Sequence, residues 1–145
     1  MMYDDNYFMK LALIEAKTAF EAGEVPIGAV VVQQNRVIGR GHNLTETLED
    51  ATAHAEMQAL TAASGTLGAK YLIDCTIYVT VEPCVMCAGA MSWTKISRLV
   101  YGASEPKFGY TKKAPTALHP KTEVLAGLMA DECSELMKRF FKDKR

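Results

Sequence analysis

Two short motifs, each at a position where a helix is expected to begin, constrain the fold more than any other feature of the sequence. One runs from His54 to Glu56 and opens a stretch rich in helix-forming residues. The other runs from Pro83 to Cys87 and follows Cys75 to Val81, whose alternation predicts a strand. Proline suits the first helical position because its missing N–H has no partner there. Both motifs carry residue types that bind metals, so the fold has to place metal-binding residues at two helix starts.

Helical and strand-like segments alternate along the rest of the chain. A first helix, capped by Asp4 or Asp5 and ending near Gly23, is followed by a hairpin with a Gln34-Asn35 turn. The expected strands are Ile27–Val32, Val37–Gly41, Cys75–Val81, Leu99–Tyr101 and Glu123–Leu125, and the later helices are Ala53–Ala63, Pro83–Trp93 and a last one carrying Leu128 to Phe140. This interleaving predicts an α/β sheet covered by helices on both faces. No linker or repeat interrupts it, so we expect a single domain over residues 1–145.

Composition and charge exclude several classes of protein. With 49% hydrophobic and 23% charged residues, the 145-residue chain is neither disordered nor fibrous. No apolar run reaches the ~20 residues of a membrane helix, and the acidic start lacks the basic region of a signal peptide, so we expect a cytoplasmic protein. The formal charge of -1 is unevenly distributed along the chain, since residues 103–145 carry 9 basic and 6 acidic groups. The near-neutral total therefore argues against indiscriminate nucleic-acid binding, but the basic last third leaves a nucleic-acid substrate open.

The two motifs together predict a catalytic zinc site. Cys84 and Cys87 lie three residues apart, so both sulfurs can face one ion from a first helical turn. His54 supplies a third ligand, and a tetrahedral zinc then keeps its fourth position for water, which marks a catalytic site. Zinc lowers the pKa of that water, and a nearby carboxylate can take its proton. We assign that role to Glu56, which can flank the metal if the site lies beyond the helix start.

Two other interpretations of the cysteines remain open. Cys75 and Cys133 lie on apolar faces and are expected to be buried, inert thiols, although either could complete a structural zinc site. A Cys-x-x-Cys pair that opens a helix after a strand is also the arrangement of a redox dithiol. The upstream His-x-Glu favours the metal, because both motifs together match the zinc deaminase signature H-x-E…P-C-x-x-C.

Beyond these motifs, the chain resembles the bacterial tRNA-specific adenosine deaminases of the cytidine-deaminase-like superfamily over nearly its whole length. The matching stretches are Glu24–Val30, Gly41–Asn43, Thr52–Glu56, Leu72–Asp74, Tyr78–Ala90, Val100–Ala103, and Asp131–Cys133 through Phe140–Phe141. The resemblance implies a three-layer α/β/α sandwich with a central mixed five-stranded sheet, one zinc ion per subunit held by His54, Cys84 and Cys87, and a homodimer.

The same resemblance implies hydrolytic deamination of adenosine to inosine at the wobble position of a tRNA anticodon. Zinc would activate the water that attacks C6, and Glu56 would shuttle the proton. Asn43 would contact the base, and the backbone amides of Ala55 and Cys84 would steady the tetrahedral intermediate. The expected substrate-binding residues are Val25, Pro26, Ile27, Asn43, Ala55 and Pro83. The alternatives are a deaminase of a free nucleobase or nucleoside such as guanine or cytosine, and a noncatalytic RNA-binding module.

Contacts with the tRNA anticodon arm are expected from the last third of the chain. This part departs from the family pattern, with Glu105 in place of the usual Asp, Phe108-Gly109-Tyr110 in place of a Gly-rich stretch, and a short region before Pro120. Its end mixes basic and aromatic residues, which suits phosphates and exposed bases. The candidate RNA contacts are Glu105, Lys107, Phe108, Lys138, Arg139, Phe141 and Lys142. Trp93 is expected in the core or at a subunit interface, and Met86 in the core.

Overall fold

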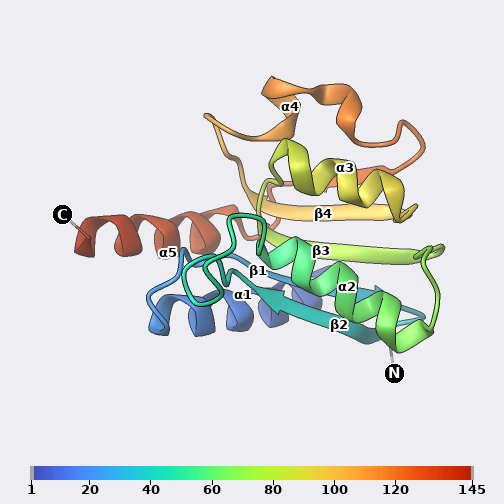
Figure 1. Ribbon diagram of the computed structural model, residues 1–145, viewed down its shortest axis with the longest axis horizontal. Coiled ribbons are helices and arrows are strands. Elements are labelled where there is room, and N and C mark those ends of the chain that lie inside the picture. Colours follow the sequence, from blue (N-terminus) through green and yellow to red (C-terminus); the bar gives the residue numbers. More distant parts are fainter. Residues whose placement is uncertain (1, 145) are drawn as a thin grey trace.

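A mixed five-stranded sheet lies between two layers of helices in the computed structural model, which describes residues 2–144 (Figure 1). The strand order is β2-β1-β3-β4-β5, with β1 antiparallel to β2 and β3, and with β3, β4 and β5 parallel. The elements are α1 (Asp5–Glu21), β1 (Gly28–Gln33), β2 (Arg36–His42), α2 (Ala55–Leu67), β3 (Cys75–Val81), α3 (Val85–Trp93), β4 (Arg98–Ala103), α4 (Tyr110–Lys113), a 3₁₀ turn (Pro115–Ala117), β5 (Glu123–Ala126) and α5 (Ala130–Asp143). The predicted fold class is confirmed.

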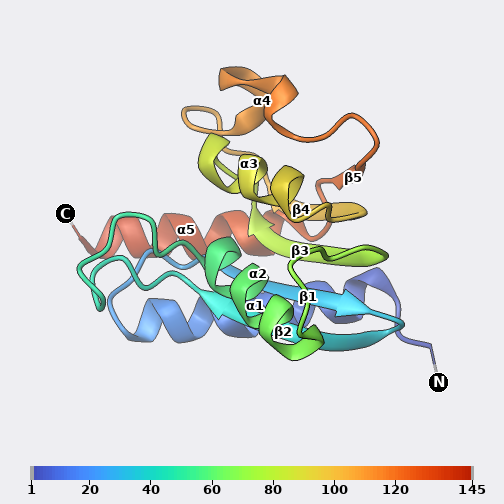
Figure 2. The ribbon, with the colours of Figure 1, turned by 45° about the vertical axis from the view of Figure 1, so that its right-hand side comes forward.

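The sheet is packed on both faces, and each face has its own core. Helices α2 and α3 cover one face, where their apolar side chains meet those of the central strands (Figure 1). Helices α1 and α5 cover the other face (Figure 2). The alternating polar residues of β3 are therefore not solvent-facing: Thr80 is fully buried and its Oγ1 accepts a hydrogen bond from the Gly28 N–H (3.2 Å), while the Tyr78 hydroxyl donates to Asp5 Oδ1 (2.6 Å).

The two helices nearest the motifs begin later than the sequence pattern predicts. Helix α2 begins at Ala55, with His54 as its N-cap, and α3 begins at Val85, with Cys84 as its N-cap. Both cap residues have extended backbones, with φ/ψ of −73°/155° and −74°/174°. The expected starts at Ala53 and Pro83 were wrong, because the ligand residues themselves make the turn from loop into helix.

Three other expectations are corrected in the second half of the chain. The region before Pro120 is not wholly irregular, since it contains α4 and the 3₁₀ turn. Helix α5 begins at Ala130 and does not include Leu128, because its N-cap residue Met129 has a left-handed backbone (φ 55°) that no helix continues through. Met86 is 36% exposed and does not belong to the core, and the 83% exposure of Trp93 excludes the core but not the subunit interface that was its other expected place. They lie on the side of α3 away from Ala88 and Met91, which pack on the sheet.

Close packing between β2 and α2 holds the first turn of that helix in place, and we expect Gly41→Ala to disturb it. A Cβ at Gly41 would overlap the backbone carbonyl of Ala55 and the amide of Ala59, neither of which can move independently. The substitution should lower the free energy of unfolding by about 1–3 kcal/mol, a typical cost of overpacking. It should also weaken zinc binding, because His54 lies immediately before Ala55. Urea unfolding and zinc competition with a chelator measure the two effects.

A matched glycine in α2 provides the control. Gly65 has open space where a Cβ would be built, so Gly65→Ala should leave zinc binding unchanged. It should raise helix stability by about 0.5–1 kcal/mol, the usual difference between glycine and alanine inside a helix. Equal zinc affinity in the Gly41 and Gly65 variants would contradict the role of this packing.

Candidate active site

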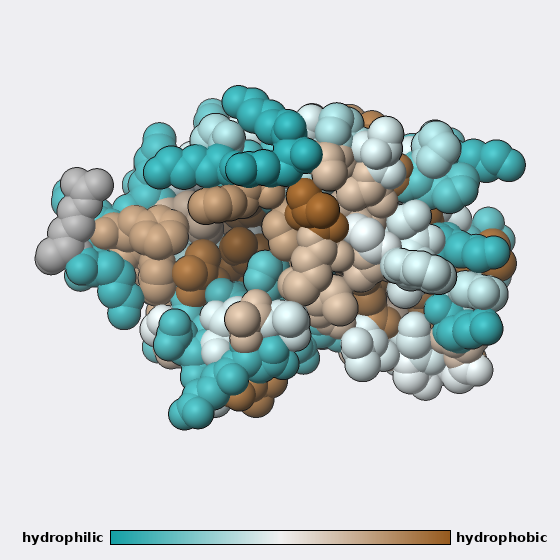
Figure 3. All heavy atoms as spheres, turned by 45° about the horizontal axis from the view of Figure 1, so that its top comes forward, coloured by the Kyte–Doolittle hydropathy of each residue, from teal (hydrophilic) through white to brown (hydrophobic). Residues whose placement is uncertain are grey.

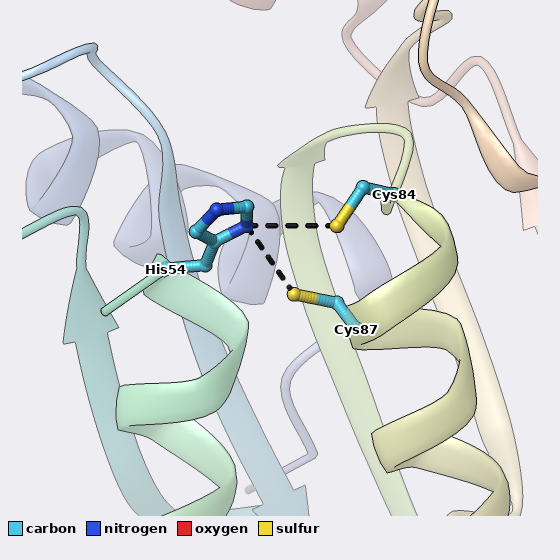
Figure 4. A group of neighbouring side chains, drawn as sticks. All are labelled: His54, Cys84 and Cys87. Carbon is cyan, nitrogen blue, oxygen red and sulfur yellow. Dashed lines mark hydrogen bonds between the residues drawn. The ribbon is translucent and has the colours of Figure 1, made fainter. Parts of the chain in front are cut away.

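His54, Cys84 and Cys87 meet where α2 and α3 begin, at the same end of the sheet (Figure 4). The His54 Nδ1 atom lies 3.6 Å from each of the two sulfur atoms. All three candidate ligand atoms lie within 4.8 Å of one another. Cys87 is fully buried and the other two are half-buried, so the group is partly accessible to solvent.

The spacing of these three atoms fits a tetrahedral metal ion. With Zn–S bonds of about 2.3 Å and Zn–N bonds of about 2.1 Å, neighbouring ligands of a tetrahedral zinc lie about 3.6 Å apart. This matches the Nδ1–Sγ distances of His54 to Cys84 and Cys87. A set of one imidazole and two thiols also binds zinc in preference to magnesium or calcium, which favour oxygen ligands. The residues present therefore fit zinc, with one coordination position left for another ligand.

Hydrogen bonding makes the cysteine pair ready to lose a proton. The Cys87 thiol donates to Cys84, and with His54 beside it this lowers the pKa of Cys84 to about 4. The same hydrogen bond, together with burial, raises the pKa of Cys87. The Cys84 thiolate in turn raises the pKa of His54. A thiolate at a helix N-terminus is both a metal ligand and a group that the helix dipole stabilises.

Glu56 lies beside the three candidate ligands and is buried, with 4% of its surface exposed. Burial raises its pKa to about 7. A carboxyl group that titrates near neutrality can both take and give a proton at working pH, which is what acid–base catalysis requires. His54 and Glu56 reach the same side because His54 stands outside the helix as its cap, whereas two helical residues at this spacing would point apart.

A cavity of about 270 Å³ opens next to this group. Its lining residues are Val25, Ile27, Asn43, Thr45, His54, Ala55, Glu56, Val81, Glu82, Cys84, Glu105 and Phe108. Of the expected substrate-binding residues, Pro26 and Pro83 are buried and are not among the lining side chains. In Figure 3, apolar side chains gather around a hollow and hydrophilic side chains border them. A mainly apolar cavity with a few polar groups is typical of a small-molecule or base-binding site.

The candidate RNA contacts fall into two groups. Glu105 and the 63%-exposed Phe108 line the cavity, and Lys107 lies exposed between them. The other four lie on α5, which projects past the same end of the sheet (Figures 1 and 2). They are exposed but none lines the cavity: Lys138, Arg139, Phe141 and Lys142. Arg139 also lies over the Phe20 ring, 5.4 Å from its centre, so it is partly engaged by α1.

Sequence reasoning missed two acidic residues next to the site. Glu82, which lines the cavity, and Glu24, which precedes the lining residue Val25, are buried carboxylates with 5% and 0% exposure. A local signal existed for Glu82, since a charged residue directly follows the apolar end of β3. Fully buried glutamates are rare unless they are paired or hydrogen-bonded, so both residues need an explanation.

Comparison with known proteins shows which family the chain belongs to. The model of the MafB19-like deaminase family matches residues 2–145. A tRNA-specific adenosine deaminase of Agrobacterium fabrum (strain C58 / ATCC 33970) is 45% identical over 150 residues, covering 99% of this chain and 98% of the relative. A solved structure from a study of A-to-I editing by tRNA:A34 deaminases has a TM-score of 0.84 and 46% identity, covering 90% of this chain and 98% of the other.

Proteins with a different named substrate share the architecture. A solved guanine deaminase of Bacillus subtilis has a TM-score of 0.68 and 36% identity, covering 79% of this chain and 70% of the other. None of the helices within residues 2–144 combines the length and apolar character needed to cross a bilayer. The full-length match at the higher identity decides the group: the chain belongs to the family of the tRNA-specific adenosine deaminases, within the MafB19-like deaminases.

Proposed function

We propose that this protein is a zinc-dependent hydrolase that converts adenosine to inosine at the wobble position of a tRNA anticodon. The observation that carries the proposal is the juxtaposition of the buried Glu56 carboxyl with the group formed by His54, Cys84 and Cys87, in one cavity. The full-length similarity to tRNA-specific adenosine deaminases supports the choice of substrate. One zinc ion per chain follows from the single group of three ligands in residues 2–144.

In this mechanism, Glu56 moves the protons. Zinc, when bound, supplies a Lewis acid that lowers the pKa of water toward neutrality. The Glu56 carboxylate takes a proton from the attacking water and delivers it to the departing amine, so that ammonia leaves from C6 of the base. The backbone N–H of Ala55 stands in the first turn of α2, where helix geometry provides no partner for it, and it can steady negative charge that develops on the base.

The cavity suits a base that has left its stack. Its volume of about 270 Å³, next to α2 and α3, is of a size for a single base, so an unpaired anticodon loop is a suitable substrate. Asn43 lines the cavity and offers an amide for the edge of the base. Phe108 at the rim offers a stacking surface for a neighbouring base, and the basic residues of α5 offer contacts to phosphates.

Two further features belong to this proposal. The exposed apolar residues Val85, Met86 and Trp93 follow one side of α3, and we propose that a second copy of the chain covers them in a homodimer. We place the protein in the cytoplasm, because two thiols that bind a metal require a reducing compartment. Sedimentation measures the assembly, and a monomer at micromolar concentration would contradict the homodimer.

A direct comparison of substrates tests the proposed reaction. We expect inosine to form in an anticodon stem-loop with adenosine at the wobble position, and no product from a stem-loop with adenosine only elsewhere in the loop. Free guanine, cytosine and adenosine run in parallel, because the similarity to a guanine deaminase makes the free base the principal rival. Mass spectrometry of digested RNA and an ammonia assay report the two outcomes. Release of ammonia from guanine while the RNA stays unmodified would mean that the protein deaminates the free base and not the tRNA.

A further inference from the structure

Glu82 holds the loop that runs from β4 to α4. Its Oε1 accepts a hydrogen bond from the backbone N–H of Glu105 (3.1 Å), and its Oε2 accepts from the N–H of Thr111 (3.1 Å) and the Thr111 hydroxyl (2.6 Å). The loop backbone packs directly on the carboxylate at Gly109, where a Cβ would overlap it. Between these attachment points lies Phe108, which lines the cavity. The carboxylate therefore ties both ends of this wall to the segment that carries Cys84.

Glu24 holds the loop on the other side of the cavity in the same way. Its Oε1 accepts from the N–H of Glu46 (3.1 Å), and its Oε2 accepts from the N–H of Thr47 (2.6 Å) and the Thr47 hydroxyl (2.6 Å). This loop leads from Asn43 and Thr45, both of which line the cavity. The next residue after Glu24, Val25, lines the cavity as well.

The two carboxylates thus repeat one pattern. Each gives one oxygen to a single backbone N–H and the other oxygen to the N–H and hydroxyl of a threonine. Among the described residues, neither Glu24 nor Glu82 has a Lys, Arg or His partner within ion-pair distance. Burial by itself raises the pKa of Glu24, but the hydrogen bonds from Thr47 and Glu46 outweigh it and hold the pKa below its ordinary value. Charge-assisted hydrogen bonds to the loop backbone keep Glu24 ionised in its buried position.

We infer that Glu24 and Glu82 are positioning residues for the substrate, each acting through the cavity-wall loop that it holds. The inference rests on the proposed function, because it assigns the two loops to RNA recognition. Neither residue is required for proton transfer, which Glu56 performs. Each instead keeps a loop in its binding-competent arrangement before the substrate arrives, so that less ordering is needed on binding.

This role predicts a specific split between the two kinetic parameters. If a loop is competent only a fraction of the time, the apparent affinity for the substrate falls by that fraction. Once the substrate is bound and the loop is ordered, the chemistry at Glu56 and the three ligands proceeds as before. Loss of either carboxylate should therefore raise KM for the stem-loop by about 10-fold or more, with kcat within about threefold of the wild-type value.

The variants for this test are Glu82→Gln and Glu24→Gln. Glutamine has the size of glutamate, but its NH₂ group faces an N–H where an oxygen stood, so only one side of each clamp can form. The first readout is backbone amide hydrogen exchange with zinc bound. We expect Glu82→Gln to increase exchange at residues 105–111 and leave residues 46–47 unchanged, and Glu24→Gln to give the reverse. Zinc content should stay at that of the wild type in both.

Matched threonine variants separate a clamp from general loosening. Thr111→Ser keeps the hydroxyl and should retain the wild-type KM, whereas Thr111→Val loses one hydrogen bond and should raise KM by a smaller factor than Glu82→Gln. Thr47→Ser and Thr47→Val repeat the comparison for the other loop. Equal exchange increases in both loops from a single glutamate variant, or an unchanged KM in either glutamine variant, would overturn the inference.

Failure of the proposed function would be recognised separately. If the wild-type protein forms no inosine in any stem-loop but deaminates a free base, the kinetic comparison is made with that base. The crossed exchange pattern with unchanged KM for the base would then overturn the positioning role of both residues. The same pattern with raised KM would keep Glu24 and Glu82 as positioning residues for the other substrate.

Discussion

Replacement of Glu56 by glutamine is expected to remove turnover almost completely while the protein still folds and binds zinc. The carboxyl is buried, its pKa is about 7, and it lies beside the ligand group in the cavity. Glutamine keeps the shape but neither accepts a proton from water nor returns one to the leaving amine. Loss of a positioned acid–base group costs about 10²- to 10⁴-fold, so kcat should fall by that factor.

The measurement combines single-turnover inosine formation with zinc analysis of the same preparation. Glu21→Gln is the control, because Glu21 is exposed in the last turn of α1, in the helix layer on the other face of the sheet. We expect Glu21→Gln to match the wild type in both measurements. Activity of the Glu56 variant within tenfold of the wild type would show that another group moves the proton. Glu56→Ala should give the same loss, with an additional decrease in stability from the cavity it leaves.

Replacement of Cys87 by alanine is expected to remove both zinc and activity. The side chain is fully buried in the first turn of α3, and its sulfur lies 3.6 Å from His54 Nδ1. Two remaining ligands bind zinc far more weakly than three, and metal affinity is coupled to the stability of the fold. We expect less than about a tenth of an equivalent of zinc after purification, no detectable inosine, and a lower melting temperature. Removal of zinc from the wild type with a chelator should reproduce the loss of activity, and added zinc should restore it.

Cys75→Ala is the matched control, since this thiol is also fully buried but lies in β3 outside the ligand group. It should keep one zinc per chain and near-normal activity. Zinc analysis of the wild type also tests the redox interpretation: metal-free protein, purified without chelator and carrying an oxidised Cys84–Cys87 pair, would mean that the two sulfurs serve electron transfer. Full zinc content in Cys87→Ala would also contradict the site.

Much of the site can be predicted from the sequence because its ligands lie at local structural boundaries. Residues such as His54 and Cys84 end a loop and begin a helix, and the signals for helix starts are short-range. The ligand group predicted from His54, Cys84 and Cys87 is the group that the folded chain brings together. The exact helix starts were predicted two residues early, since propensity and a proline signal do not distinguish the cap residue from the residues before it.

Burial in the layered fold was harder to predict. The alternation in β3 suggests one polar face, but a strand in the middle of a sheet covered on both sides buries nearly all of its side chains, and Tyr78 and Thr80 find hydrogen-bond partners inside. Trp93 follows an apolar run, yet it is exposed because the run lies on a helix with only one side against the sheet. Neighbours in space, rather than neighbours in sequence, decide both cases.

The sequence by itself determined the chemistry: which atoms can bind a metal, which carboxyl can move a proton, and that both lie at helix starts. Only the tertiary structure decided the shape of the site. Two loops held by Glu24 and Glu82 form part of the cavity wall, and each of the hydrogen bonds that hold them joins residues 22 to 29 positions apart. Local periodicity carries no information about contacts over such distances, because they depend on how the strands order in the sheet and on which buried charge has to be satisfied.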